Sequence, residues 1–315
     1  MTDIRSPSPE PRLSVIIPTF NNEDVLRRCL TSWHDAAVAH RVEIIVVEDG
    51  CRDGTVALLE SESRTTWGRG HLRWLHMDDA HELRCTNAGM SQARAPLMMA
   101  WQDDMFLRGQ WLVPELLRTF NVYDEIGLLS LSRGLNHHQL NDPIASWEDL
   151  VDWRRLSSTI GPPPANWFRI QEVDAVIRPW IVRRECIDRV GPLDEAFVPT
   201  EWDEADLASR IRQAGWKVAT TGYERLGGYE HQGSSTLGSL SQAYRECVLR
   251  NGRQFHERWD DVIAREQARK RGTWRRRPTV AGWVNTFVRM GERALNRVAP
   301  RSRGAGRAEA PKKHA

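Results

Sequence analysis

The sequence predicts an α/β fold built on an open, mostly parallel sheet with flanking helices. Two β-branched runs, "LSVIIPTF" (13–20) and "VEIIVVEDG" (42–50), are apolar almost throughout, which is typical of strands covered on both faces. Between them, "NNEDVLRRCLTSW" has Asn21 or Asn22 as a candidate N-cap and acids in its first turn. Its apolar residues recur at helical spacing, at Val25, Leu26, Cys29, Leu30 and Trp33. The three segments therefore predict a β-α-β unit.

Strands and helices continue to alternate along the chain. A helix from about Thr55 is followed by the strand "LRWLHM", a helix in "TNAGMSQARA", the strand "PLMMAW", the helix "QWLVPELLRTF" and the strand "IGLLSLS". The pattern weakens over residues 133–172, which we interpret as an irregular insertion. It returns with "VDAVIRPWIVRREC", the turn "GPLDEAF", the helix "EADLASRIRQAG" with Gly215 as its C-cap, and the strand "WKVATTG". This alternation favours a parallel sheet within one large domain or two closely packed halves.

Charge distribution, cysteine spacing and the length of apolar stretches limit the kinds of protein that this sequence can encode. The net charge of +2 hides an asymmetry, because from Asn251 onward 17 Lys and Arg face 6 Asp and Glu, which suits an anionic partner or simple solubility. The five cysteines show no CxxC spacing, and the N-terminal stretch is polar and Pro-rich, so we expect a cytoplasmic protein with reduced thiols. No apolar stretch approaches the roughly 20 residues of a membrane span.

Acidic residues follow two of the predicted strands, where open α/β sheets bind their ligands. Asp103 and Asp104 in "AWQDDMFL" offer oxygen ligands to Mg²⁺ or Mn²⁺, which can bridge to a diphosphate; the alternative is a solvated turn. Asp49 in "VVEDG" could accept hydrogen bonds from a nucleobase, or be a turn residue before Gly50. The sequence contains neither a GxxxxGK[ST] loop nor GxGxxG, so phosphate binding of those two kinds is excluded.

A second acidic cluster surrounds the start of a predicted helix. "EWDEADLASRIRQAG" holds Glu201, Asp203, Glu204 and Asp206 there. A helix N-terminus is complemented by one or two carboxylates. At least one of the four is therefore available as a general base.

Five segments in order resemble the family 2 glycosyltransferases, which are inverting, nucleotide-sugar-dependent enzymes of GT-A fold. They are "SVIIPTFNNEDVLRRCLTSW", "EIIVVEDGCRDGT", "TNAGMSQARAPLMMAWQDD", "GPLDEAFVPTEWDEADLASRIRQAGWK" and "YEHQGSS", which together span roughly Leu13 to Ser235. Each segment alone is weak evidence for the family, but five segments in the family's order and spacing are strong evidence.

The resemblance implies a role for each matching residue. Pro18, Thr19 and Asn87 belong to nucleotide-sugar binding, and Asp49 contacts the base, typically uracil. Asp103 and Asp104 form the DXD-type motif, with Asp104 the metal ligand and Asp103 a ribose or metal contact; the family commonly has an acid where this chain has Trp101. His231 matches a histidine that can complete metal or diphosphate coordination, although a lone histidine is more often structural. Glu204 matches the catalytic base, with Asp203 as the second choice.

The reaction implied is transfer of a sugar from a UDP- or dTDP-linked donor to an acceptor hydroxyl in polysaccharide or glycolipid biosynthesis, with Mn²⁺ or Mg²⁺ as cofactor. The acceptor is a saccharide or a lipid-linked molecule, and the insertion at 133–172 is expected to set its specificity. Trp180 and Trp202 lie beside the motifs and could stack on its sugar rings, or be core residues. A nucleotidyltransferase and a non-catalytic binder of membrane or nucleic acid remain as alternatives, although no nucleic acid partner is expected.

These expectations divide the chain into a disordered tail (1–11), a GT-A domain (12–250) and a basic extension (251–315). Within the domain, 12–104 would bind the nucleotide sugar and 105–250 the acceptor. The extension contains an amphipathic helix whose shared apolar face is formed by Val280, Trp283, Val284, Phe287, Ala294, Leu295 and Val298. Either residues 271–315 bring this face to an anionic membrane, or the face packs on the catalytic domain.

Overall fold

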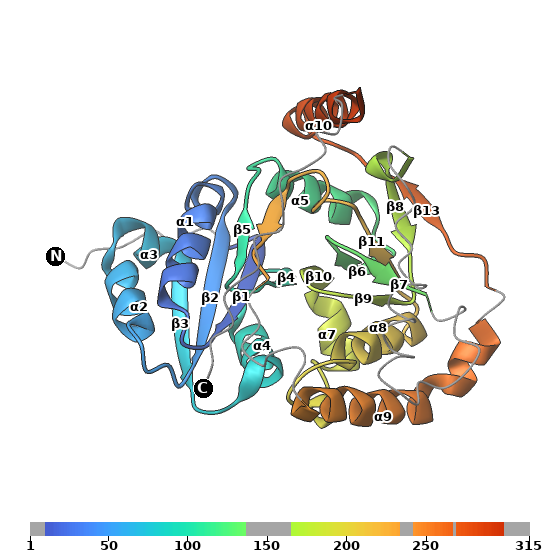
Figure 1. Ribbon diagram of the computed structural model, residues 1–315, viewed down its shortest axis with the longest axis horizontal. Coiled ribbons are helices and arrows are strands. Elements are labelled where there is room, and N and C mark those ends of the chain that lie inside the picture. The colour runs from blue at the N-terminus through green and yellow to red at the C-terminus, as the bar shows by residue number, and fades with distance from the viewer. Residues whose placement is uncertain (1–9, 137–164, 234–241, 267–268, 299–315) are drawn as a thin grey trace, which may run out of the picture.

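The computed structural model describes residues 10–136, 165–233, 242–266 and 269–298 (Figure 1). Within these residues nine strands form one sheet in the order β13-β8-β11-β6-β10-β4-β1-β2-β3. Their bounds are β1 (Leu13–Thr19), β2 (Val42–Asp49), β3 (Leu72–Met77), β4 (Leu97–Ala100), β6 (Ile126–Ser130), β8 (Arg169–Glu172), β10 (Trp180–Arg183), β11 (Lys217–Thr220) and β13 (Thr273–Arg275). Two small pairs join β5 (Met105–Leu107) to β12 (Tyr229–His231) and β7 (Gly134–Leu135) to β9 (Ala175–Val176).

Helices cover both faces of the sheet (Figure 1). Side chains of α1 (Glu23–His40), α2 (Thr55–Arg64), α3 (Thr66–His71) and α5 (Leu112–Val122) pack in one core with Val15 and Ile17 of β1. Those of α4 (His81–Gln92), α7 (Arg184–Val190), α8 (Asp203–Gln213) and α9 (Gln242–Glu266) pack in a second core with Ile16. Alternate residues of β1 therefore enter opposite cores, which explains why the strand is apolar throughout. The remaining helical elements are η2 (Ala165–Phe168), η3 (Glu195–Phe197) and α10 (Val280–Val298).

The predicted β-α-β unit is confirmed, with β1 parallel to β2 and β4, and β2 parallel to β3. Asn22 occupies the N-cap position of α1, but its side chain makes no capping hydrogen bond. The first helical N–H, that of Glu23, is bound instead by the Asp53 carboxylate at 3.0 Å. The helix predicted in "TNAGMSQARA" begins earlier than expected, at His81.

The second half of the sheet is less regular. β10 is antiparallel to both β4 and β6, and β8 is antiparallel to β11 and β13, while the other strands share one direction. The boundary expected after residue 250 falls inside α9, and β13 extends the central sheet. Part of the basic extension is therefore built into the same layers as the rest of the chain.

Some expectations fall partly or wholly outside the described residues. These are the disordered tail at 1–11, most of the insertion at 133–172, the end of "YEHQGSS" and the residues after 298. In the described part of the chain, we find no helix with the length and apolar content needed to cross a bilayer.

Candidate active site

A cavity of about 400 Å³ opens where β1, β2 and β4 end. Pro18, Thr19, Asp49, Asp103 and Asp104 line it; their roles in donor and metal binding, which the resemblance implies, stay a prediction. Five acids contribute to its described lining, but no lysine or arginine does; the acids are Asp49, Asp79, Glu82, Asp103 and Asp104. An anionic ligand such as a diphosphate would therefore need a cation to accompany it.

Asp103 is fixed by its neighbours. Thr19 Oγ1 donates a hydrogen bond to Asp103 Oδ2 at 2.7 Å, and the Asn22 side chain also bonds to this carboxylate. Burial raises the pKa of Asp103 to about 6, and the negative charge of Asp104 adds to the rise. Asp103 is thus a positioned acceptor whose ionised form would be favoured by a nearby cation.

Asp104 and His231 come together although 127 positions separate them in sequence. The pairing of β12 with β5 sets His231 beside Met105, and its Nε2 lies 3.4 Å from Asp104 Oδ2. Their hydrogen bond raises the pKa of His231. The described residues contain no group of three or more His, Cys, Asp or Glu side chains arranged for a metal. Asp104 and His231 nevertheless fit a cation that takes its remaining ligands from water and phosphate oxygens, as Mg²⁺ commonly does.

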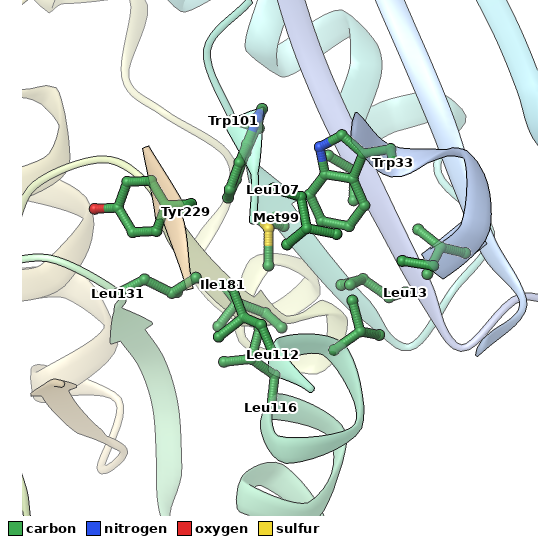
Figure 2. Packing of buried hydrophobic residues seen from close by; sticks show 14 of the residues in the cluster. Leu13, Trp33, Met99, Trp101, Leu107, Leu112, Leu116, Leu131, Ile181 and Tyr229 are labelled. Atoms are coloured by element: carbon green, nitrogen blue, oxygen red, sulfur yellow. The ribbon is translucent and has the colours of Figure 1, made fainter. Parts of the chain in front are cut away.

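Trp101 is fully buried in the hydrophobic core (Figure 2) and is not among the residues that line this cavity. Its indole N–H donates to the Met105 carbonyl at 2.9 Å, and its ring makes edge contacts with Trp33 and Tyr229. The position that commonly carries an acid in the family is therefore a packing position here, and the acidic pair begins at Asp103.

Asp49 lines the cavity but is already engaged. Its two carboxylate oxygens accept hydrogen bonds from the backbone N–H groups of Ala80 at 2.6 Å and His81 at 2.9 Å. These groups belong to the N-cap and first residue of α4. Asp49 therefore anchors the start of that helix, which supports the structural alternative, while contact with a base stays a prediction.

Asn87 is not among the residues that line the cavity. Its amide forms two hydrogen bonds with the main chain of Leu193, accepting from N–H at 3.0 Å and donating to C=O at 2.8 Å. These bonds tie α4 to the turn "GPLDEAF". Asn87 is therefore engaged in a structural link, while its role in nucleotide-sugar binding stays a prediction.

A second cavity of about 280 Å³ adjoins the first, and the two share Glu82, Gln102 and Thr200. Asp203 and Glu204 line the second cavity, at the first turn of α8. The two residues before them, Glu201 and Trp202, both adopt left-handed backbone conformations. This tight turn directs the acidic pair toward the border with the first cavity.

Arg178 holds three carboxylates at this border. Its guanidinium nitrogens lie 2.9 Å from Glu82, 3.5 Å from Asp203 and 3.2 Å from Glu204, and its side chain is 9% exposed. The cation offsets part of the repulsion among the acids. Sequence reasoning missed Arg178 and Glu82; the signal was an arginine in the apolar run "VDAVIRPW", since a buried charge requires partners.

Glu204 is the more accessible member of the acidic pair, with 17% of its side chain exposed against 3% for Asp203. Trp180 Nε1 donates a hydrogen bond to Glu204 Oε1 at 3.1 Å. Burial raises the pKa of both carboxyls, and for Glu204 the charge of Asp203 adds to the rise, whereas Arg178 opposes it. A raised pKa suits a group that must accept a proton near neutral pH.

The other acids of the cluster have structural partners. Asp206 is fully buried and bonded to Arg210, Arg258 and Trp259. Glu201 accepts a hydrogen bond from the Tyr244 hydroxyl. We expected the helix start to use only some of its four carboxylates structurally, and Asp206 is one that has such a structural role.

Trp180 and Trp202 are both largely buried. Trp180 is 1% exposed, and its indole positions Glu204. Trp202 is 7% exposed, donates to the Val248 carbonyl at 3.0 Å and packs against Phe255, and it also contributes to the lining of the second cavity. This burial favours the core alternative, while stacking on an acceptor stays a prediction.

Comparison with known proteins shows what this chain is similar to. Residues 14–134 match the family model Glycosyl transferase family 2. The fold resembles the crystal structure of GalNAc-T7 with UDP, GalNAc and Mn²⁺, at 14% identity and a TM-score of 0.57 over 81% of this chain and 49% of that one. It also resembles S. aureus TarS 1–349 in complex with UDP-GlcNAc, at 12% identity and a TM-score of 0.51 over 89% of this chain and 80% of that one. A search of curated protein sequences gave no match.

The chain spans about half the length of GalNAc-T7. The resemblance to family 2 glycosyltransferases is confirmed by the family match, and the α/β class of GT-A type is confirmed by the structural neighbours.

Proposed function

We propose that the protein is an inverting, metal-dependent glycosyltransferase that moves a sugar from a UDP- or dTDP-linked donor to a hydroxyl of a saccharide or lipid-linked acceptor in polysaccharide or glycolipid assembly. The observation that carries the proposal is the pair of adjoining cavities. The first cavity contains Asp103 and Asp104, and Asp104 lies beside His231. The second cavity contains the accessible carboxylate of Glu204.

In this proposal the first cavity binds the donor. Thr19 and Asn22 orient Asp103 toward the nucleotide ribose or its cation. Asp104 and His231 would hold Mn²⁺ or Mg²⁺, which neutralises charge on the leaving diphosphate. The acidic lining without lysine or arginine supports this metal dependence. So does the presence of UDP and Mn²⁺ in the GalNAc-T7 structure.

The second cavity binds the acceptor. Glu204 takes the proton of the acceptor hydroxyl as that oxygen attacks the anomeric carbon from the face opposite the nucleotide, which inverts its configuration. Trp180 and Arg178 hold the carboxylate in position. Arg178 also stabilises the ionised form that accepts the proton.

A thermal-shift panel tests the donor half of the proposal. UDP, dTDP, GDP and CDP are each added with and without Mn²⁺ to the wild type and to Asp104→Asn. A ligand at 100 times its Kd stabilises the native state by about 2.7 kcal/mol, so a binding nucleotide raises the Tm measurably. We expect a Mn²⁺-dependent shift with UDP or dTDP that Asp104→Asn abolishes. The donor assignment is wrong if no nucleotide shifts the wild type in either condition.

A further inference from the structure

Helix α10 is attached to the protein through its polar side. Thr286, fully buried, accepts a hydrogen bond from Arg276 at 2.9 Å, and Asn285 donates to the Leu226 carbonyl at 2.6 Å. Arg276 precedes the helix and forms a buried ion pair with Glu115 of α5. Gly282 permits close approach, because a Cβ there would collide with the Glu115 carboxylate. The helix is therefore held in a defined orientation on the body.

The opposite face of α10 carries large apolar side chains that the described part of the chain leaves mostly exposed, although the Trp283 ring also contacts Phe168, with ring centroids 5.4 Å apart. We call this face the α10 ridge; its residues and their exposed fractions are Val280 82%, Trp283 40%, Val284 59%, Phe287 59%, Val288 52% and Leu295 71%. They recur at helical spacing, on the side away from Thr286 and Asn285. Figure 1 shows α10 at the edge of the molecule, above α5 and β8. Within the described residues, the alternative in which this face packs on the catalytic domain holds for Trp283 against Phe168, whereas most of the face is exposed.

Such a ridge is unusual for a helix that contacts water, because surface helices normally turn their apolar side to the core. Six large exposed apolar side chains on one helix mark an interaction surface. Trp283 and Phe287 stack with ring centroids 5.7 Å apart, which makes one continuous aromatic patch at the centre of the ridge. The occupant must therefore accept a long, narrow apolar stripe.

The surroundings of the ridge are basic. Residues 269–298 contain nine Lys and Arg against one acid, Glu292. Lys270, Arg275 and Arg277 are exposed just before the helix, and none of them forms a salt bridge within the described residues. Arginine-rich sequence continues beyond residue 298. A partner that binds the ridge should therefore be apolar where it meets the centre of the ridge and anionic where it meets the basic border.

We propose that the α10 ridge binds the surface of an anionic lipid membrane. An apolar stripe bordered by basic residues lies in the interface plane, with apolar groups among the acyl chains and cations at the headgroups. A second copy of this chain fits less well, because joining two ridges would bring the basic borders of both copies together. The proposal does not rest on the proposed catalytic function, although a membrane-held enzyme would reach a lipid-linked acceptor.

The test uses the full chain and vesicles of equimolar phosphatidylglycerol and phosphatidylcholine in a co-sedimentation assay. Trp283→Ser with Phe287→Ser removes the centre of the ridge, and Val38→Ser with Val122→Ser removes two exposed apolar side chains elsewhere as a matched control. We expect the wild type and the control to pellet with the vesicles. The ridge variant should bind about tenfold or more weakly, since it loses two aromatic groups from the apolar phase.

The charge requirement is tested separately. Arg275→Gln with Arg277→Gln should weaken binding to the same vesicles by about 30-fold, because two basic residues near the surface are lost, and vesicles of phosphatidylcholine alone should not pellet the wild type. Unfolding curves should show one cooperative transition for every variant, with only the ridge variant slightly less stable than the wild type, because Trp283 also contacts Phe168. Equal pelleting of the wild type and the ridge variant overturns the proposal. So does a wild-type dimer in solution that ignores vesicles and dissociates on substitution of the ridge.

Discussion

Replacing Arg178 by methionine is expected to destabilise the fold strongly and in a pH-dependent way. The side chain is 9% exposed and its guanidinium serves Glu82, Asp203 and Glu204 at once, at 2.9, 3.5 and 3.2 Å. Removing one partner of a buried ion pair typically costs about 3–5 kcal/mol, because the opposite charge stays buried without compensation. Methionine keeps the length of the apolar stem, so the loss reports charge and not volume.

The pH dependence follows from the direction of the pKa shifts. Burial raises the pKa of Asp203 and Glu204 above the ordinary carboxyl value near 4. A group whose pKa is raised by folding contributes stability below its unfolded pKa and loses it as pH rises through the folded pKa. Without Arg178 both pKa values should rise further. The variant should therefore be closest to the wild type near pH 5 and furthest from it near pH 8.

Urea unfolding at both pH values measures the free energy of unfolding directly. Arg84→Met is the matched control, since Arg84 pairs with Glu195 at 3.0 Å on the surface and such a pair is worth about 0–1 kcal/mol. Arg178→Lys should recover part of the loss, since it restores one positive charge without the fork of donors. A loss below about 1 kcal/mol at pH 8 for Arg178→Met, or a loss that is larger at pH 5 than at pH 8, would refute the reasoning.

Further predictions concern the two cavities. Glu204→Gln should lower turnover by about 10²–10⁴-fold while leaving the Kd for donor unchanged, as measured by initial rates with a confirmed acceptor and by titration calorimetry. Trp180→Phe should lower kcat more than it raises KM, because it removes only the hydrogen bond that orients Glu204; an unchanged kcat would contradict this. After chelation of divalent ions, uridine should still bind but UDP should not. His231→Ala should raise the Mn²⁺ concentration that restores UDP binding. Binding of UDP without metal would contradict the role given to Asp104. Asn87→Ala should destabilise the fold by about 1–3 kcal/mol with no effect on nucleotide affinity, and a selective loss of affinity would return Asn87 to the donor site.

Local patterns predicted the elements that are determined locally. The strand at 72–77 and the helix from Thr55 were placed correctly, since apolar runs and helical spacing can be read within ten residues. The contact of β12 with β5 could not be read in this way, because two segments more than 100 positions apart pair through their backbones. It is this pairing that brings His231 to Asp104, so only the family resemblance could connect them.

Amphipathicity alone could not orient α10. The apolar and polar faces were correctly separated in sequence, yet the pattern does not say which face a protein will use for packing. The outcome depends on Arg276 and Glu115, whose buried ion pair anchors the segment before the helix from a partner more than 150 positions away. Similarly, the sequence left open whether Trp180 stacks on an acceptor or lies in the core; the ring is 1% exposed because the side chains of its strand enter cores on both faces of the sheet.

The negative charge of the carboxylates is balanced differently in the two cavities. This difference links cation binding in the first cavity to the protonation state of Glu204 in the second. In the second cavity Arg178 offsets Glu82, Asp203 and Glu204. In the first, the described lining offers no lysine or arginine beside its five acids. A diphosphate entering without a cation would add negative charge next to Glu82, draw on the same guanidinium and raise the pKa of Glu204 further. A diphosphate entering with a divalent cation adds far less charge, so it raises the pKa of Glu204 less and leaves more of this carboxyl ionised to accept a proton.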